Sequence, residues 1–395
     1  MIGLPPFLSF SENERILQLK ILMIILRTVK NISSLNIAAS VLLFLAAILA
    51  AVVANSSLSP VYQDFLLQEL HLRIGNFNLF SHGGHPLKMI EFINDCLMTV
   101  FFLAVGLEIK RELLVGELSS VRKAALPFIA ACGGMVVPVV IYALSVASGT
   151  PETRGMAIPM ATDIAFSLGV LSLLGKRVPL SLKIFLTAFA VVDDIGGILV
   201  IALFYSADVA YGYLIAAAVL YVFLYYMGKF GVTQKIFFLF FGVIIWYLFL
   251  QSGIHSTISG VILAFVIPAR PRLDAGKYIE RIRDIIGEFP VSKSDNIVLT
   301  NAQIATLKQV ERASDYVISP LQSLEDNLHG AVSFVILPLF AFANAGVVFS
   351  GSGSIVGDVS IAVAAGLLLG KFLGIYLFTW LAVKSGVALM PAGMN

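Results

Sequence analysis

The feature that most constrains this chain is a series of about ten apolar stretches, each long enough to cross or nearly cross the roughly 30 Å hydrocarbon core of a bilayer. Backbone groups in that core find no water, so a spanning segment satisfies its own hydrogen bonds by forming a helix. We therefore predict an all-α polytopic membrane protein. Its spans are placed at 38–56, 89–113, 122–147, 156–175, 179–206, 211–228, 235–250, 253–269, 328–350 and 359–383.

Composition supports this class. The chain is 58% hydrophobic and 13% charged, whereas soluble domains carry about 25% charged residues. A net charge of +2 is too small to indicate nucleic acid, and no basic patch is interleaved with aromatic residues. Cys96 and Cys132 both lie in apolar stretches, which favours small core residues over a disulfide framework.

The distribution of basic residues predicts the orientation and the organisation of the chain. Lys and Arg are concentrated in alternate loops, beginning with the loop after the second stretch, so the positive-inside rule places the N-terminus in the cytoplasm. Residues 1–36 lack a signal cleavage site and are interpreted as an interfacial segment. The membrane domain then occupies 37–270 and 327–395, separated by a cytoplasmic insertion at 271–326 in which Ile279, Ile282 and Ile286 recur at helical spacing.

One connecting loop, 57–88, is predicted to be extracytoplasmic. It contains LRIGNFNLFSHGGHP, a short alternating pattern around turn residues that indicates a β-hairpin. A lone hairpin is marginally stable in water. We therefore expect a second copy of the chain to stabilise it, giving a homodimer through this loop.

Two adjacent aspartates lie in the apolar run FAVVDDIGGILV. Placing one acidic side chain at the centre of a membrane helix costs about 2.5–3.5 kcal/mol on the insertion scale, so these aspartates are expected to have a functional role. Neighbouring residues project about 100° apart on a helix, so Asp193 and Asp194 serve different partners. Lys371, in LLLGKFLGI, is the basic residue within the tenth stretch. A buried Asp193–Lys371 pair would cost less than either charge alone.

A further carboxylate coincides with a weakened helix. Asp163 follows Thr162 in IPMATDIAFSLG, and Pro159 lies four residues before it. An interrupted helix is tolerated in a bilayer only where it is buried in protein or lines a water-filled cavity. Other charged groups have ordinary structural readings, which we favour: Asp95 could hold a helix end, and Glu108, Arg111 and Glu112 are spaced as helical ion pairs.

Five ordered motifs resemble the NhaA-type sodium/proton antiporters: ATDIAFSLGVLSLLGKRVPLSLKIFL, VVDDIGGILVIALFY, SGIHSTISGVI, LPLFAFANAGV and LLLGKFLGI. The resemblance implies an inverted-repeat transporter fold with a broken helix at the ion site. It implies that Asp194 is the principal cation ligand and proton carrier, completed by Asp163 and by an oxygen of Thr162. It also implies that Asp193 pairs with Lys371 and that Asp95 lies on the ion pathway.

The same resemblance implies the activity. The protein would exchange sodium or lithium for protons, electrogenically and under pH control, in the inner membrane of a bacterium. It would be a transporter rather than an enzyme, in contact with membrane lipids, and would need no cofactor beyond the transported Na⁺ or Li⁺, held by Asp163 and Asp194, and H⁺. A group linked to pH response is matched by Glu108, Arg111 and Glu112, by His255, and by Glu325 and His329, although the basic residue expected beside the last two is absent.

The sequence ends differently from the family pattern. Family chains continue with two more helices, the first of which crosses the broken fourth helix, whereas this sequence ends at Asn395. We therefore expect about 10 spans of 12 and little exchange from the chain alone. The alternatives are a transport-incompetent truncated homologue, and a sodium-coupled symporter or channel built on the same carboxylates. An intramembrane aspartic protease is disfavoured because the GxGD pattern of that class is absent and Lys371 would have no role.

Overall fold

The computed structural model describes residues 38–75, 77–146, 150–160, 167, 178–204, 209–270, 275–287, 300–349 and 357–390. Within these ranges six helices are long and apolar enough to cross a membrane. A seventh span is counted if helix Ala38–Ala54 and α2 (Ser59–Leu67), which meet at a bend of 113°, form one unit. The all-helical membrane class is confirmed, whereas about ten spans and an inverted repeat remain predictions.

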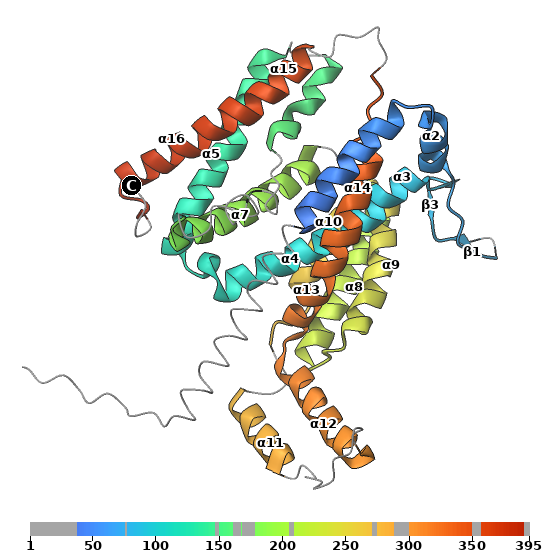
Figure 1. Ribbon diagram of the computed structural model, residues 1–395, viewed down its shortest axis with the longest axis vertical. Helices are drawn as coiled ribbons and strands as arrows, with labels where there is room; N and C mark the ends of the chain where they lie inside the picture. The colour runs from blue at the N-terminus through green and yellow to red at the C-terminus, as the bar shows by residue number, and fades with distance from the viewer. Residues whose placement is uncertain are drawn as a thin grey trace, which may run out of the picture.

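The helices follow the predicted apolar stretches closely (Figure 1). Most begin or end within a few residues of the predicted bounds because hydropathy marks where the chain can lie in hydrocarbon. Their bounds are α3 Met89–Phe92 with α4 Met98–Val115, α5 Val121–Ser145, α7 Leu180–Phe204, α8 Tyr211–Lys229, α9 Lys235–Ser252, α10 Thr257–Val266, α13 Pro320–Ala331 with α14 Leu337–Asn344, and α15 Asp358–Ala365 with α16 Lys371–Lys384.

Three of these spans contain one π-helical turn each, at Ile93–Leu97, Val332–Ile336 and Gly366–Gly370. A π-turn inserts an extra residue into the helical repeat and is frequent at functional sites. The first turn carries Asp95, and the third directly precedes Lys371. Two predicted sites therefore coincide with local irregularities that hydropathy does not reveal.

The helices form two packed groups with α4 between them. In Figure 1, α5, α7, α15 and α16 lie together toward the upper left, and α8, α9, α10 and α13 lie toward the lower right. Leu103 and Leu107 of α4 belong to the core of the second group, with Phe238, whereas Ile109 belongs to the core of the first, with Val191. Helix α4 therefore supplies apolar side chains to both cores.

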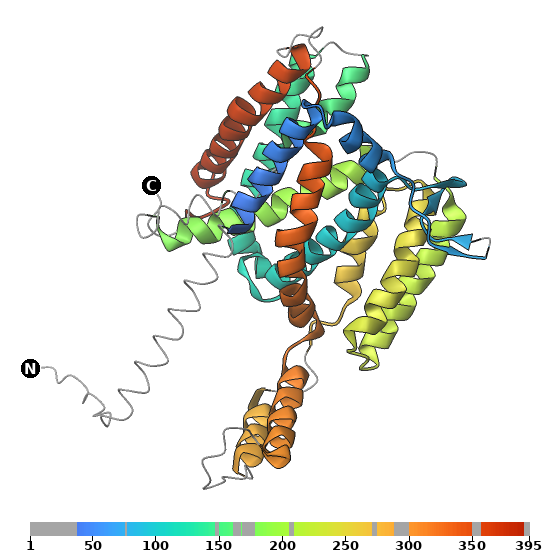
Figure 2. The same cartoon turned by 45° about the vertical axis from the view of Figure 1, so that its right-hand side comes forward.

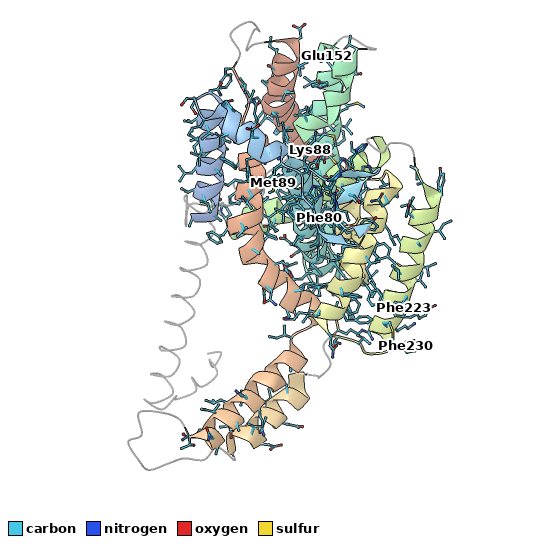
Figure 3. The ribbon with its side chains drawn as sticks, turned by 90° about the vertical axis from the view of Figure 1, so that its right-hand side faces the viewer. Phe80, Lys88, Met89, Glu152, Phe223 and Phe230 are labelled. Carbon is cyan, nitrogen blue, oxygen red and sulfur yellow. The ribbon has the colours of Figure 1, made fainter. Side chains whose placement is uncertain are left out.

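The loop at 57–88 forms two small antiparallel strand pairs rather than one hairpin. They are β1 (Arg73–Ile74) with β2 (Phe77–Asn78), and β3 (Ser81–His82) with β4 (His85–Pro86). Phe80 anchors the loop to the bundle, where its ring meets Phe92 edge to face at 5.1 Å, and it is labelled in Figure 3 beside Lys88 and Met89. The loop is thus held by its own chain, and the second copy stays a prediction.

The insertion contains two helices, α11 (Ala275–Gly287) and α12 (Asn301–Val317), which pack on one another and extend away from the bundle (Figure 2). Ile279 and Ile286 are exposed, as expected of a surface helix. The ninth span begins at Pro320, earlier than the predicted start at 328. Ser319 caps this helix by accepting a hydrogen bond from the Gln322 backbone amide. A serine followed by a proline is a typical start of a helix, but hydropathy alone does not detect it.

Two predicted spans, the fourth and the eighth, differ from the structure, and the predicted N-terminal segment lies outside the residues that the structure describes. α10 is shorter than the predicted span at 253–269, because Gly253 takes a left-handed conformation (φ 80°) that ends α9 and separates it from α10. Pro151–Met160, at the start of the predicted fourth span, is a 3₁₀ helix. The interfacial segment at 1–36 lies outside the described residues.

The crossing of α5 and α16 depends on two glycines. A Cβ added at Gly374 would lie 2.1 Å from the Gly133 carbonyl oxygen, and a Cβ at Gly133 would lie 2.3 Å from the Gly374 carbonyl oxygen. Each added methyl would meet backbone, which cannot rotate away. Small residues at such a crossing allow two membrane helices to approach closely.

We expect Gly374→Ala to destabilise the folded protein by about 1–3 kcal/mol, because it overpacks this crossing. The measurement is the midpoint of thermal or denaturant unfolding in detergent. Gly330→Ala is the matched control: it makes the same change on α13, where a Cβ meets nothing within 4 Å. The control should leave the midpoint unchanged or raise it, because Ala favours a helix. Equal midpoints for the two variants would contradict the close crossing.

Candidate functional site

The paired aspartates lie on α7, inside the first helix group. Five apolar residues before them, Ala188 to Val192, are all buried, and this packing fixes the rotation of the helix. Asp193 is itself 4% exposed, whereas Asp194 is only partly buried. The roughly 100° between consecutive helical residues thus directs one carboxylate into protein and the other toward a more open environment.

Lys371 is brought to Asp193 by the last helix pair. Its Nζ lies 3.1 Å from Asp193 Oδ2, and the lysine side chain is 13% exposed. Lys371 also donates a hydrogen bond to the Met160 carbonyl oxygen. A single ammonium group therefore links α7, α16 and the end of the 3₁₀ helix Pro151–Met160.

The π-turn before Lys371 packs against two prolines. A Cβ at Gly366 would lie 2.8 Å from the Pro159 side chain, and one at Gly370 would lie 2.7 Å from Pro138 Cα. Pro138 lies within α5 and Pro159 within the 3₁₀ helix. Because neither glycine carries a side chain, the π-turn can pack closely against the two prolines, and Lys371 follows it directly in the chain.

The predicted ligands Thr162 and Asp163 lie outside the described residues. Met160, whose carbonyl oxygen binds Lys371, ends the described segment just before them. Across the ranges that the structure describes, no three His, Cys, Asp or Glu side chains are arranged to hold a metal ion. The aspartate site as described consists of Asp193, Asp194 and Lys371.

Asp95 occupies a separate position, in the π-turn of the second span. The Ser256 hydroxyl donates to Asp95 Oδ1 at 3.1 Å, and the Trp246 indole donates to the Asp95 carbonyl oxygen at 3.3 Å. Asp95 and His255 line one cavity of about 620 Å³, together with residues of the 57–88 loop. The structure thus places Asp95, predicted to lie on the ion pathway, and His255, predicted to contribute to pH response, on the wall of the same cavity.

A third group lies at the other end of α4. Arg111 Nε contacts Glu325 Oε1 of α13 at 3.0 Å, and Arg111 Nη1 contacts Glu112 Oε1 at 3.3 Å. Glu112 is 8% exposed, and Glu108 is one helical turn before it. His329 is exposed in the last turn of α13. The structure therefore assembles Arg111, Glu112 and Glu325 into one ion-pair group.

Two polar contacts were missed by the sequence analysis. Lys110 donates hydrogen bonds to the carbonyl oxygens of Ala264 and Phe265, at 3.4 and 2.7 Å, and to that of Ile267. It thereby caps the end of α10, where Pro268 leaves carbonyls unsatisfied. The sequence offered little indication of this capping role, because a lysine at the end of a predicted span is ordinarily interpreted as marking the cytoplasmic side.

The second missed contact joins Asn94 and Asn344, whose side-chain amides bond reciprocally at 2.8 and 3.2 Å. This pair fastens the π-turn that carries Asp95 to the end of α14. The signal was two carboxamides in otherwise apolar motifs, FINDC and FAFANAG. Nothing in the sequence indicated that the two would meet.

Comparison with known proteins gives a consistent result. A family model described as Na⁺/H⁺ antiporter 1 matches residues 30–395. Proteins named Na⁺/H⁺ antiporter NhaA from Bacteroides thetaiotaomicron and Bacteroides fragilis are each 75% identical over 373 residues, which cover 94% of this chain and 85% of the relative. One of the same name from Phocaeicola vulgatus is 61% identical over 350 residues, covering 88% of this chain and 78% of that protein.

The ion pair can be tested without a transport assay. Lys371→Ala should leave the buried Asp193 carboxylate without its charge partner and destabilise the protein by about 3–5 kcal/mol. Asp193→Asn in the same chain should recover part of this loss, because it removes the remaining charge. The measurement is the unfolding midpoint of the wild-type, single and double variants. Simple additivity of the two effects would contradict an energetic coupling between these side chains.

Proposed function

The chain belongs to the Na⁺/H⁺ antiporter 1 family, and from this membership we propose that it exchanges sodium for protons through the carboxylates of α7. It is a multi-pass membrane protein, and its relatives are named as transporters rather than enzymes. The observation that carries the proposal is the buried Asp193–Lys371 ion pair beside the partly exposed Asp194. The pair neutralises the Asp193 carboxylate, and we assign the binding of the transported cation to the adjacent Asp194.

The chemistry of the carboxylates supplies the exchange. Sodium and lithium are hard cations that prefer carboxylate, carbonyl and hydroxyl oxygens. We propose that Asp194, Asp163 and Thr162 provide these oxygens. A proton on Asp194 removes the charge that holds the cation, so cation and proton compete for one site. If the site opens to one side of the membrane at a time, this competition becomes exchange.

We further propose that exchange is electrogenic. Neighbouring ionisable groups titrate as a coupled set, so protonation of Asp194 and the state of the Asp193–Lys371 pair influence one another. When the pair separates, Lys371 can release its own proton. More protons than cations would then move in each cycle.

The ion-pair group of Arg111, Glu112 and Glu325, with Glu108, is proposed to contribute to pH control. These side chains join the end of α4 to the middle of α13. A change in their protonation would alter the packing of α13 on α4. Because α4 also contributes to the core around α7, such a change can reach the aspartate site through packed side chains.

The location and assembly of the protein are proposed from the sequence pattern. Basic loops alternate in a way that favours a cytoplasmic N-terminus in a bacterial inner membrane. The 57–88 loop, with its two strand pairs, is the proposed contact for a homodimer. Membrane lipids would surround the exposed apolar faces of the helices.

Two alternatives weigh less. A transport-incompetent homologue finds no support, since the chain is 75% identical to proteins named as antiporters over 94% of its length. The expectation of little exchange from this chain is not supported for the same reason. A sodium-coupled symporter or channel would use the same carboxylates, but the relatives that are 61–75% identical to this chain are named as antiporters.

Everted vesicles from a bacterial strain without its own sodium/proton antiporters test the proposal. We expect added sodium to reverse the quenching of an amine dye, because protons leave the acidic lumen as sodium enters. Asp194→Asn should abolish this response, since the amide keeps the shape of the side chain and loses its charge. The matched control is Asp284→Asn, on the exposed surface of α11.

Vesicles that contain Asp284→Asn should show the same sodium-dependent recovery of dye fluorescence as vesicles that contain the unmodified protein at equal expression. An equal response from Asp194→Asn would contradict the assignment of that residue. Sodium uptake without any change in the lumenal pH would instead indicate a channel or a symporter coupled to another solute. Repeating the assay with lithium in place of sodium tests the prediction that the site accepts both cations.

A further inference from the structure

The turn between β3 and β4 places two histidines opposite one another. His82 and His85 are directly paired across the two strands. The residues between them, Gly83 and Gly84, have φ values of 58° and 85°. A two-residue turn with positive φ at both positions strongly favours glycine, so the His-Gly-Gly-His sequence itself fixes this tight turn.

Cross-strand pairing puts the two imidazoles on the same face. Directly opposite residues of an antiparallel pair have Cβ atoms about 4.5–5.5 Å apart, with their side chains on one side of the ribbon. Two imidazole nitrogens can then reach one metal ion at bond lengths of about 2.0–2.1 Å. Both histidines are exposed and line the cavity of about 620 Å³ next to α3 and the α9–α10 junction.

The turn is anchored rather than loosely attached. Leu87, two residues after His85, is 3% exposed and packs with Trp246 and Leu250 of α9. The Leu87 amide donates to the Phe80 carbonyl oxygen at 2.9 Å, and the Gln251 side chain donates to the Ser81 carbonyl oxygen. These contacts hold both strands against the bundle, so little ordering is needed when a ligand binds.

The charges around the cavity favour a cation. Glu69, Glu91 and Asp95 line it together with one lysine, Lys88. When the histidines are neutral, three carboxylates face one ammonium group. A concave surface with this excess of negative charge raises the local concentration of cations.

We propose that His82 and His85 form a two-histidine site for a divalent transition metal such as Zn²⁺ or Cu²⁺, at the mouth of this cavity. Imidazole suits these metals, whereas sodium and lithium prefer oxygen, so the site is distinct from that of the transported cation. No third His, Cys, Asp or Glu is already in place among the residues described. Water fills the remaining positions, and the carboxylates of Glu69, Glu91 and Asp95, which line the same cavity, are the candidates to replace it.

The experiment is zinc titration of the purified full chain by calorimetry, with an affinity tag that contains no histidine. We expect one Zn²⁺ to bind with micromolar affinity, and His82→Gln and His85→Gln each to weaken it at least about tenfold, the lower bound for removing even a supporting group of a metal site. The matched control is His71→Gln. His71 is exposed in the same loop, 3.5 Å from Glu69, and does not line the cavity.

A second readout identifies the ligands directly. The electron paramagnetic resonance spectrum of bound Cu²⁺ should show coupling to two imidazole nitrogens, and His82→Gln or His85→Gln should reduce this to one. His71→Gln should change neither the affinity nor the spectrum. The proposal is overturned if zinc does not bind, if all three variants bind alike, or if His71→Gln weakens binding as much as the other two. Because neither readout uses transport, failure of the proposed antiport would leave this result intact.

Discussion

The contact between Lys371 and Asp193 is the interaction on which the interior of this protein depends. Two charges are buried there among apolar helices, and each would be costly alone in a bilayer. Lys371 also binds the carbonyl oxygen of Met160, so one ammonium group connects α7, α16 and the 3₁₀ helix that leads toward Thr162 and Asp163. The two neighbouring carboxylates therefore lie in different surroundings, one paired with a lysine in the protein interior and the other only partly buried. The helix rotation that buries Asp193 is the same rotation that leaves Asp194 more accessible.

Irregular backbone makes this contact possible. The π-turn Gly366–Gly370 precedes Lys371, and its glycines approach Pro138 and Pro159 at distances that leave no room for a side chain. Farther along the same helix, Gly374 and Gly133 bring α16 and α5 into backbone contact. In a membrane, such close approach replaces the hydrophobic effect as a source of helix association. The glycines of this helical span that allow close packing and the lysine that forms the buried ion pair therefore act together.

Helix α4 joins the places where charge is concentrated. One end of its span holds Asp95 in a π-turn, bonded to Ser256 and fastened by the neighbouring Asn94–Asn344 pair. The other end holds Arg111 and Glu112, paired with Glu325 of α13, and Lys110, which caps α10. Between these ends, Leu107 packs into one core and Ile109 into the other. A shift of α4 therefore changes the packing of both helix groups.

The sequence by itself determined the membrane class, most helix positions and the pairing partner of Asp193, because hydrocarbon sets the length of an apolar segment and penalises every charge within it. It also indicated turn residues in the 57–88 loop, where local backbone sterics favour glycine in the His-Gly-Gly-His turn. Only the tertiary structure decided which helix faces meet. The Asn94–Asn344 contact and the cap of α10 by Lys110 join segments that are far apart in the sequence. Hydropathy records how deep a residue can lie in the membrane, but carries no information about which neighbour it faces.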